Sequence, residues 1–230
     1  MSEATKDGST DPSDLLDEYD EYDDVADEPD DPDLLRPASQ SWRARTTIEM
    51  IASGVLGLIA SFVLSIEAWH LAADPNAVFS CDINQVLSCG AVARTWQAHL
   101  LGFPNAFLGI FFESVVLTIS IAMLAGVRFP RWMMLGAEAL YSIGLFFALW
   151  LFSQSYFVIH ALCPWCLLIT LTTTLVWAGL TRINVRDGNI PAPAAARRFV
   201  AAGNDWFVTG GFLLLLAVMI VVRYGSLLLA

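Results

Sequence analysis

The four cysteines are the residues of this chain whose type and spacing could carry chemistry. Cys163 and Cys166 are separated by two residues in the pattern Cys-Pro-Trp-Cys, and seven residues separate Cys81 from Cys89. Pro164 suits the first position of a helix, so we predict that Cys163 caps a helix and that Cys166 lies one turn later on nearly the same face. Unpaired N–H groups and the helix dipole at such a terminus favour a thiolate. This pair could therefore form a small disulfide ring, accept electrons and release them.

Two other uses of four cysteines compete with redox chemistry. A structural zinc site usually has close spacing in both cysteine pairs, and the spacing of Cys81 and Cys89 fits that poorly. Two inert disulfides could instead staple small outer loops. A rigid staple does not need a proline-primed helix terminus, whereas a redox relay does. The even number of cysteines, all at predicted ends of spans or between spans, favours oxidisable thiols that face an oxidising compartment.

The composition excludes an ordinary soluble domain. Of the 230 residues, 56% are hydrophobic and only 15% are charged, against about one-quarter charged in a typical globular chain. A bilayer core requires roughly 20 apolar helical residues per span. Five segments meet this requirement approximately: residues 48–70, 106–125, 133–157, 162–181 and 206–222. No strand alternation competes with this pattern, so we predict an all-α integral membrane protein.

The arginines indicate how the spans are oriented, because short cytoplasmic loops carry an excess of positive charge. They precede the first span, and they occupy the connections between the second and third spans and between the fourth and fifth: Arg36, Arg43, Arg45, Arg128, Arg131, Arg182, Arg186, Arg197 and Arg198. The loop after the first span contains only Arg94, and the turn near residues 155–161 contains no Lys or Arg. This pattern predicts a cytoplasmic N-terminus and an outer C-terminus, with Arg223 as the exception. Both cysteine pairs then reach the same outer face.

The acidic residues are concentrated near the N-terminus. Fifteen of the 23 Asp and Glu residues lie within residues 3–33, alongside a single cation, Lys6. A segment so charged and so poor in large aliphatic residues cannot bury enough apolar surface to fold. We therefore expect a disordered cytoplasmic tail over residues 1–45, a five-span membrane domain over residues 46–225 and a short outer tail over residues 226–230.

The position of Cys166 favours a lipid-soluble electron acceptor. It is predicted to lie one helical turn inside the apolar region, where a quinone ring could approach it. The chain has no Gly-rich phosphate loop in a strand–helix unit that would hold a nucleotide cofactor. We expect a membrane quinone as acceptor, and neither a metal nor a nucleic-acid partner.

Residues 46–222 resemble the vitamin K epoxide reductase family in its bacterial form without a fused thioredoxin-like domain. Three motifs carry the resemblance in order and spacing: Cys81-Asp82 followed by Cys89, the segment FPNAFLG at 103–109, and CPWC at 163–166. The resemblance implies a four-helix bundle around a quinone site, a fifth transmembrane helix, and an outer lid loop with a short helix.

The resemblance also implies an order of electron transfer. Cys163 and Cys166 would be the active-site pair, with Cys166 nearest the quinone. Cys81 and Cys89 would be the shuttle pair, in which Cys81 meets the thiol of a partner protein and Cys89 exchanges with Cys163. The partner would be a separate DsbA-like thioredoxin-fold protein, because the chain ends at Ala230 without a thioredoxin-like domain. The protein would support disulfide formation in proteins exported across a bacterial cell membrane.

Four further residues correspond to quinone-site positions of the family. Asn105 would hydrogen-bond a quinone carbonyl, Phe107 would help to line the ring pocket, and Thr95 matches a Ser/Thr position on the lid helix. Thr170 stands four residues after Cys166, where vertebrate members have a tyrosine that binds the substrate. The shorter side chain favours reduction of a plain quinone, menaquinone or a related one, over reduction of an epoxide.

Three ionisable residues outside these motifs invite other interpretations. Glu113 falls near the middle of the second span, where an ionised carboxylate is costly, so a polar partner or protonation is expected and a proton relay is one interpretation. Glu138 is expected to snorkel toward the inner interface or to pair with Arg131. Quinone reduction needs two protons, so a catalytic role for His160 beside Cys163 is one interpretation, although an interfacial histidine is more often simply solvated.

Two alternative functions remain distinguishable by experiment. A DsbB-like oxidoreductase would carry its Cys-X-X-Cys motif in the first outer loop and the wider pair in the second, and this chain has the reverse order. A membrane scaffold or small transporter held by two disulfides is the second alternative. It predicts that Cys163→Ala changes stability without abolishing a quinone-dependent activity.

Overall fold

The computed structural model describes residues 38–228, and every regular element in that range is helical. Its five long helices are α3 (Gln40–Ala73), α5 (Ala106–Leu124), α6 (Arg131–Gln154), α7 (Pro164–Arg186) and α9 (Asp205–Leu228). All five are long and apolar enough to cross a membrane, which confirms the predicted all-α membrane fold. Most of the predicted acidic tail (residues 1–37) and the last two residues of the chain lie outside the described residues.

Four short elements connect the long helices. Helix α4 (Cys89–Ala93) and the 3₁₀-helix η1 (Trp96–His99) lie between α3 and α5, and the π-helix η2 (Ser155–Ile159) continues α6. Helix α8 (Ala194–Ala201) lies between α7 and α9, where the sequence indicated only a basic loop. Helix α3 begins well before the predicted span because Ser39 caps it: its hydroxyl accepts a hydrogen bond from the Trp42 N–H at 3.3 Å.

Two glycines end membrane helices at the same side of the bundle. Gly126 follows α5 with φ +95°, and Gly188 follows α7 with φ +73°, a region that glycine enters without steric cost. The next N–H in each case bonds back to the helix: Val127 to the Ala122 carbonyl at 3.0 Å and Asn189 to the Asn184 carbonyl at 2.9 Å. This arrangement satisfies carbonyls that a helix end would otherwise leave unpaired.

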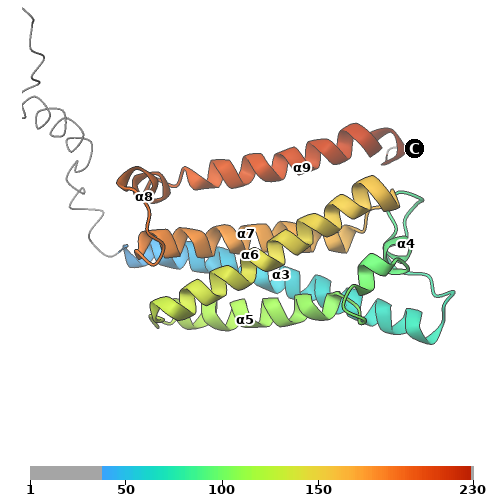
Figure 1. Cartoon of the computed structure of the whole chain (residues 1–230), viewed down its shortest axis with the longest axis horizontal. Coiled ribbons are helices and arrows are strands. Elements are labelled where there is room, and N and C mark those ends of the chain that lie inside the picture. Colours follow the sequence, from blue (N-terminus) through green and yellow to red (C-terminus); the bar gives the residue numbers. More distant parts are fainter. Residues whose placement is uncertain (1–37, 229–230) are drawn as a thin grey trace, which may run out of the picture. The chain divides into compact units, whose positions relative to one another are not determined.

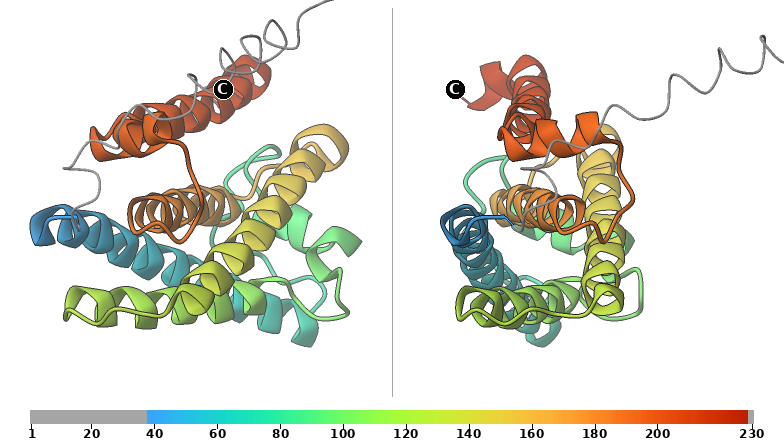
Figure 2. Two further views of the ribbon diagram at one scale, coloured as in Figure 1. Left: turned by 60° about the vertical axis from the view of Figure 1, so that its left-hand side comes forward. Right: turned by 90° about the vertical axis from the view of Figure 1, so that its left-hand side faces the viewer.

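Helices α3, α5, α6 and α7 pack into a four-helix bundle, and α9 lies outside it beside α7 (Figures 1 and 2). Small side chains allow α3 to approach its neighbours closely. Ser53, Gly57, Ser61 and Ser65 recur every four residues on its buried face. A Cβ on Gly109 of α5 would collide with Ser61. Small residues at this spacing are typical of helix packing in membranes, where close backbone approach supplies van der Waals contact.

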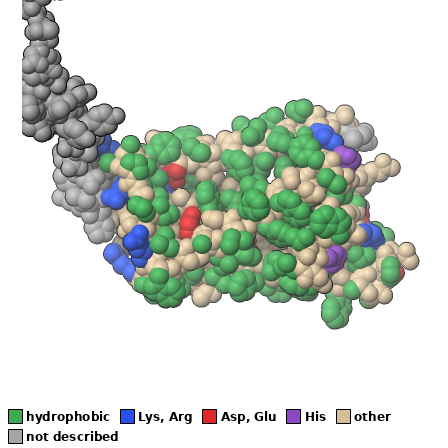
Figure 3. All heavy atoms as spheres, viewed as in Figure 1, with side chains coloured by type: hydrophobic (Ala, Val, Ile, Leu, Met, Phe, Trp, Pro, Cys, Tyr) green, Lys and Arg blue, Asp and Glu red, His purple; other side chains and the backbone are tan. Residues whose placement is uncertain are grey.

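The surface has the character of a membrane-spanning body. Large apolar side chains are exposed along the helices, among them Phe62, Phe146, Phe207 and Val222. In the view of Figure 3 they form a broad band, and the Lys and Arg side chains gather toward the two ends of the molecule. One of these is the cysteine end, which contains residues 74–105 and 155–166. The arginine end is the opposite one and contains the start of α3 and the end of α7.

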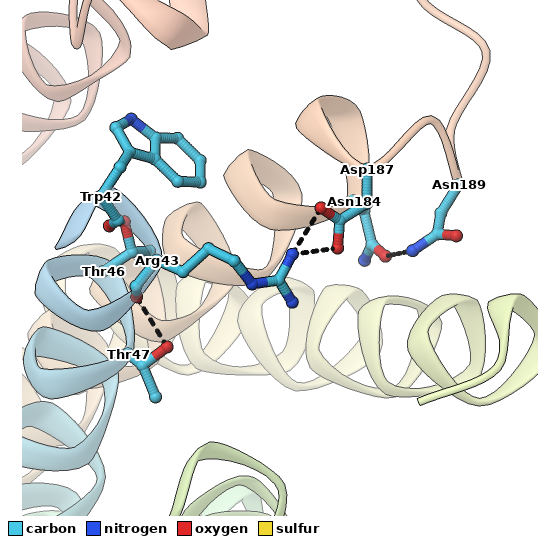
Figure 4. Close-up of polar contacts among 7 residues, drawn as sticks. All are labelled: Trp42, Arg43, Thr46, Thr47, Asn184, Asp187 and Asn189. Atoms are coloured by element: carbon cyan, nitrogen blue, oxygen red, sulfur yellow. Dashed lines mark hydrogen bonds and ion pairs between the residues drawn. The ribbon is translucent and has the colours of Figure 1, made fainter. Parts of the chain in front are cut away.

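A network of polar contacts ties α3 to α7 at the arginine end (Figure 4). The Arg43 guanidinium donates to both carboxylate oxygens of Asp187, at 2.5 and 2.7 Å. The amide of Asn189 donates to the Asn184 side-chain oxygen at 2.9 Å. The Thr47 hydroxyl donates to the carbonyl of Arg43 at 2.8 Å. Of these contacts, the Arg43–Asp187 ion pair links the start of α3 to the end of α7, at the end of the bundle that lies farthest from the cysteines.

The predicted pairing of Glu138 with Arg131 is wrong. Glu138 is buried, and it accepts hydrogen bonds from the Thr181 hydroxyl at 2.5 Å and the Asn184 amide at 3.1 Å. Arg131 instead donates to the carbonyl of Asn189 at 2.9 Å. The polar partners come from α7, which packs against α6, so Glu138 is satisfied inside the bundle and does not reach the interface.

Helix α9 is attached to the rest of the molecule near both of its ends. At the arginine end, Arg182 of α7 donates to both oxygens of Asp205 at 2.9 Å, and its guanidinium lies 4.8 Å from the Trp42 ring and 5.4 Å from the Trp206 ring. At the cysteine end, the buried Tyr224 donates to the carbonyl of Tyr156 at 2.9 Å.

Candidate active site

The connection between α3 and α5, residues 74–105, forms a lid that carries the first cysteine pair. Cys81 and Cys89 are joined in a disulfide with 5.7 Å between their Cα atoms. Helix α4 begins at Cys89, and the Ser88 hydroxyl caps it by accepting the Ala91 N–H at 3.0 Å. Both cysteines are buried, Cys81 at 6% and Cys89 at 1% exposed. A reagent that attacks this disulfide must therefore displace part of the lid.

Asp82 organises the lid between the two cysteines. Its carboxylate accepts hydrogen bonds from the Phe79 N–H at 3.0 Å, the Ser88 hydroxyl at 2.7 Å and the Gly90 N–H at 2.8 Å. Partial burial by itself would raise the pKa of Asp82. The hydrogen bonds from Gly90, Ser88 and Phe79 and the charge of Arg94 outweigh it and lower the pKa of Asp82 below its ordinary value of 3.8. The ionised carboxylate therefore stabilises the closed lid.

We expect the lid to loosen in acid because of this carboxylate. Because the pKa of Asp82 is lower in the closed lid than in the unfolded chain, its carboxylate stabilises the lid fully above pH 3.8, the unfolded-state pKa. That stabilisation is lost as the pH falls through the lower folded-state pKa. Amide hydrogen exchange at Gly90 should lose protection across that window. In Asp82→Asn the same amide should be poorly protected at neutral pH and insensitive to acid. Equal protection of Gly90 in both proteins at pH 7 would contradict this role.

A short backbone bridge brings the lid to the second cysteine pair. Leu87 and Leu162 pair as an isolated parallel bridge. The Ser88 N–H donates to the Leu162 carbonyl at 3.0 Å, and the Leu162 N–H donates to the Val86 carbonyl at 2.7 Å. Cys89 follows Ser88 directly and Cys163 follows Leu162 directly, so the bridge brings two cysteines of different pairs into one buried cluster.

The predicted cap of α7 is confirmed. Cys163 is the residue before the helix and Pro164 occupies its first turn. The Cys166 N–H donates to the Cys163 sulfur at 3.2 Å. Both are free thiols, Cys163 buried and Cys166 partly buried. Backbone N–H groups at a helix N-terminus stabilise negative charge, so this cap suits a sulfur that acts as a nucleophile or leaving group.

The segment before Cys163 is shaped by a π-helix and by α9. Element η2 ends at Ile159, and the next residue, His160, has a left-handed conformation with φ 58°. The Arg223 guanidinium of α9 lies 3.1 Å from Nδ1 of His160 and 4.9 Å from the centre of the Tyr156 ring. His160 does not line the cavity described below. Its contacts make it part of the anchor between α9 and the turn that leads to Cys163.

A cavity of about 160 Å³ lies under the lid, inside the four-helix bundle. Its walls come from α3, the lid, α5, α6, η2 and α7, and Cys89, Cys163 and Cys166 all line it. Apolar side chains such as Phe112 and Phe147 make up most of the surface. A dry cavity of about 150 Å³ accommodates a benzene ring. The volume and lining therefore suit an aromatic ring next to the cysteines.

Asn105 meets the requirements for a polar contact to such a ring. Its side-chain N–H donates to the Gln97 carbonyl at 2.6 Å, and its side-chain oxygen is buried with no hydrogen-bond partner. The residue lines the cavity. An unpartnered buried amide oxygen is costly unless a ligand or water satisfies it. A quinol hydroxyl would satisfy that oxygen by donating a hydrogen bond to it, and the second N–H of the amide can donate to a quinone carbonyl.

The structure brings together only some of the predicted ring contacts. Thr170 lines the cavity, with its hydroxyl donating to the Cys166 carbonyl at 3.0 Å. Thr95 and Phe107 are not among the described residues that line it. The Thr95 hydroxyl donates to the Val92 carbonyl at 2.7 Å, and the Phe107 side chain is 43% exposed. Their roles in ring binding stay predictions without a contact to support them.

Several polar residues of the cavity wall had no predicted place in it, among them Gln97, His99, Glu113 and Tyr141. Gln97 is buried in the lid, and its side chain lies 3.4 Å from that of Gln154. Glu113 stood out in the sequence as an acid within a span, and that signal could have placed it facing the bundle interior. The other three have no sequence pattern that distinguishes them from surface residues.

A sequence model of the vitamin K epoxide reductase family matches residues 48–180. The match covers more than half of the chain and includes both cysteine pairs, the lid and the cavity. The chain belongs to the vitamin K epoxide reductase family. Membership makes it a membrane oxidoreductase of the disulfide- and quinone-linked class, consistent with its apolar helices and its bonded cysteine pair. A comparison with curated proteins found no match.

The Cys81–Cys89 disulfide disagrees with the alternative of a four-cysteine zinc site. A zinc site needs four thiolates, whereas Cys81 and Cys89 are bonded to each other. In the described part of the chain, His, Cys, Asp and Glu side chains form no group of three or more that could hold a metal ion.

Proposed function

We propose that this protein reoxidises a DsbA-like thioredoxin-fold thiol oxidase and passes the electrons to a lipid quinone, menaquinone or a related one. The observation that carries the proposal is the backbone bridge between Leu87 and Leu162. It joins the lid disulfide to the Cys-Pro-Trp-Cys turn directly above an apolar cavity. A staple or scaffold would have no use for two cysteine pairs held against each other in this way.

Electrons enter the relay at the lid in this proposal. A thiolate of the partner attacks Cys81, which breaks the Cys81–Cys89 bond and releases the Cys89 thiolate. The partner's second thiolate then displaces Cys81, so the partner leaves as a disulfide and the lid holds a dithiol. Because Cys81 is buried in the closed lid, the partner reaches its sulfur only when the hydrogen bonds to Asp82 break and the lid opens.

The second exchange moves the electrons to the cavity. The Cys89 thiolate attacks Cys163 of an oxidised Cys163/Cys166 pair, which releases the Cys166 thiolate. Cys81 then displaces Cys163 and re-forms the lid disulfide. The outcome is a bonded lid and two free thiols at Cys163 and Cys166, which is the arrangement described above. A quinone in the cavity would accept the two electrons of the Cys163/Cys166 dithiol. Net disulfide formation is thermodynamically favourable when the quinone is more oxidising than protein dithiols.

The orientation completes the proposal. The arginine end lies in the cytoplasm of a bacterial cell and the cysteine end at the outer face of its membrane, as the positive-inside rule predicts. The outer face is where exported proteins acquire disulfides. The domain limits proposed from the sequence, residues 46–225 for the membrane body, place the whole relay in that body.

The proposed function is tested with the purified protein, a reduced DsbA-like protein and a menaquinone analogue. Thiols of the partner should disappear only when quinone is present, with one quinol formed for each disulfide. Omitting the quinone controls for air oxidation. Loss of partner thiols at the same rate without quinone, or no loss with it, would overturn the proposal.

Asn105→Ala should weaken quinone use and leave thiol exchange at the lid disulfide unchanged. Removing one hydrogen bond to a quinone oxygen costs about 1 kcal/mol, so KM for the quinone analogue should rise by roughly five- to tenfold. Exchange between the partner and the Cys81–Cys89 disulfide begins at Cys81, which does not line the cavity, and should keep its wild-type rate. An unchanged KM would show that Asn105 does not contact the quinone.

A further inference from the structure

Glu113 and Tyr141 form a buried pair in the wall of the cavity, and the relay described above does not use it. The Tyr141 hydroxyl donates to Oε2 of Glu113 at 3.1 Å and lies 3.3 Å from the carbonyl of Phe112. Each side chain is 1% exposed, and both line the same cavity as Cys166. Glu113 lies eight residues beyond Asn105 along α5, about 12 Å further into the bundle.

The surroundings of Glu113 do not support a negative charge. Its carboxyl group packs against Gly57 of α3, near the Thr172 hydroxyl of α7. None of the described residues that line the cavity is a lysine or arginine. An ionised carboxylate without a cation is strongly disfavoured in an apolar interior, and such a group takes up a proton instead. Glu113 is therefore held as the neutral acid, with Tyr141 fixing its position.

A neutral acid at this position could supply a proton that quinone reduction in the cavity requires. Reduction of a quinone to a quinol by two electrons takes up two protons, and oxidation of the Cys163/Cys166 dithiol releases two. The two oxygens of a quinone lie at opposite sides of its ring. Asn105, near the lid, has only amide N–H groups and cannot give up a proton. The deep side of the cavity needs a group that can.

We propose that Glu113 is the proton donor at the deep side of the cavity and that Tyr141 is its positioning residue. The inference rests on the proposed function. The O–H bond of the Glu113 carboxyl breaks as an O–H bond of the quinol forms. The electron pair comes from the Cys166 thiolate as the Cys163/Cys166 disulfide closes. The Glu113 carboxylate regains one of the two protons that the dithiol releases, and the other goes to the quinol oxygen nearer the lid, so protons and electrons balance over the cycle.

The first test is a single-turnover measurement of the quinone step. Protein with prereduced Cys163 and Cys166 is mixed with a menaquinone analogue, and quinol formation is followed. Glu113→Gln keeps the volume and the contact with Tyr141 but has no acid proton, so the rate should fall at least about 100-fold. Tyr141→Phe leaves the acid in place without its hydrogen bond and should slow the step about tenfold. Glu138→Gln is the matched control, because Glu138 is a buried acid outside the cavity wall, and it should react at the wild-type rate.

The second test does not depend on turnover. The infrared spectrum of the protein at neutral pH should contain the carbonyl band of a protonated carboxylic acid that shifts when the quinone analogue binds. The shifting band should persist in Glu138→Gln and be missing from Glu113→Gln. A spectrum of the wild type without such a band would overturn the inference.

The two levels of the proposal fail in different ways. If the wild type transfers no electrons to quinone, the proposed function fails and this inference fails with it. If the wild type is active and Glu113→Gln forms quinol at the wild-type rate, only the inference is overturned. Exchange between the partner and the lid disulfide serves as the folding control, and it should be unchanged in all three variants.

Discussion

Replacing Cys166 by alanine is expected to stop electron transfer to quinone and to trap a disulfide between Cys89 and Cys163. In the intact protein, the Cys166 thiolate leaves when Cys89 attacks Cys163. In the reverse exchange, Cys166 attacks Cys163 and breaks the Cys89–Cys163 disulfide. Without it, the free Cys163 can attack Cys89 of the lid disulfide, and only Cys81 is left to resolve the product. The bridge at Leu87 and Leu162 holds the two sulfurs in one buried cluster, which favours the trapped form.

Non-reducing peptide mapping measures this outcome directly. A peptide that links residues around Cys89 to residues around Cys163 should accumulate in Cys166→Ala and be missing from Cys163→Ala. Quinone-dependent oxidation of the partner should be undetectable in both variants. If either variant keeps that activity, the relay is wrong. Loss of thermal stability alone, with activity intact in Cys163→Ala, would favour the disulfide-stapled scaffold instead.

Replacing Cys89 by alanine should separate the two halves of the relay. The protein partner delivers its electrons only through the lid, so oxidation of the reduced partner should fall below detection. Cys89→Ala also removes the lid disulfide, so a small dithiol such as dithiothreitol is expected to reach Cys163 and Cys166 in the cavity beneath the lid without the lid exchange. Quinone reduction driven by dithiothreitol should therefore persist in Cys89→Ala.

The matched control for this split is Cys166→Ala, which should lose both activities. Cys81→Ala should behave like Cys89→Ala with the protein partner, since Cys81 is the sulfur that the partner attacks. The assay needs only quinol absorbance with each reductant in turn. A variant without Cys89 that still oxidises the protein partner would show that electrons bypass the lid, and the proposed order would have to be abandoned.

The sequence by itself determined the features that depend on residue type and local spacing. Apolar length predicted five membrane helices, because a bilayer core imposes a minimum number of apolar residues on any span. The Cys-Pro-Trp-Cys pattern predicted the cap of α7, because proline at a first helical position and the helix dipole act within a single turn. The acid in the middle of the second span marked Glu113 for the bundle interior.

Only the tertiary structure decided which of these residues meet. The Leu87–Leu162 bridge consists of backbone groups from segments 75 residues apart, and backbone hydrogen bonds have no side-chain signature in a sequence. The partners of Glu138 depend on how α6 and α7 are rotated against each other, so its expected contact with Arg131 proved wrong. The cavity too is a product of packing, and it placed Gln97, His99 and Tyr141 in the same cavity wall as three of the cysteines.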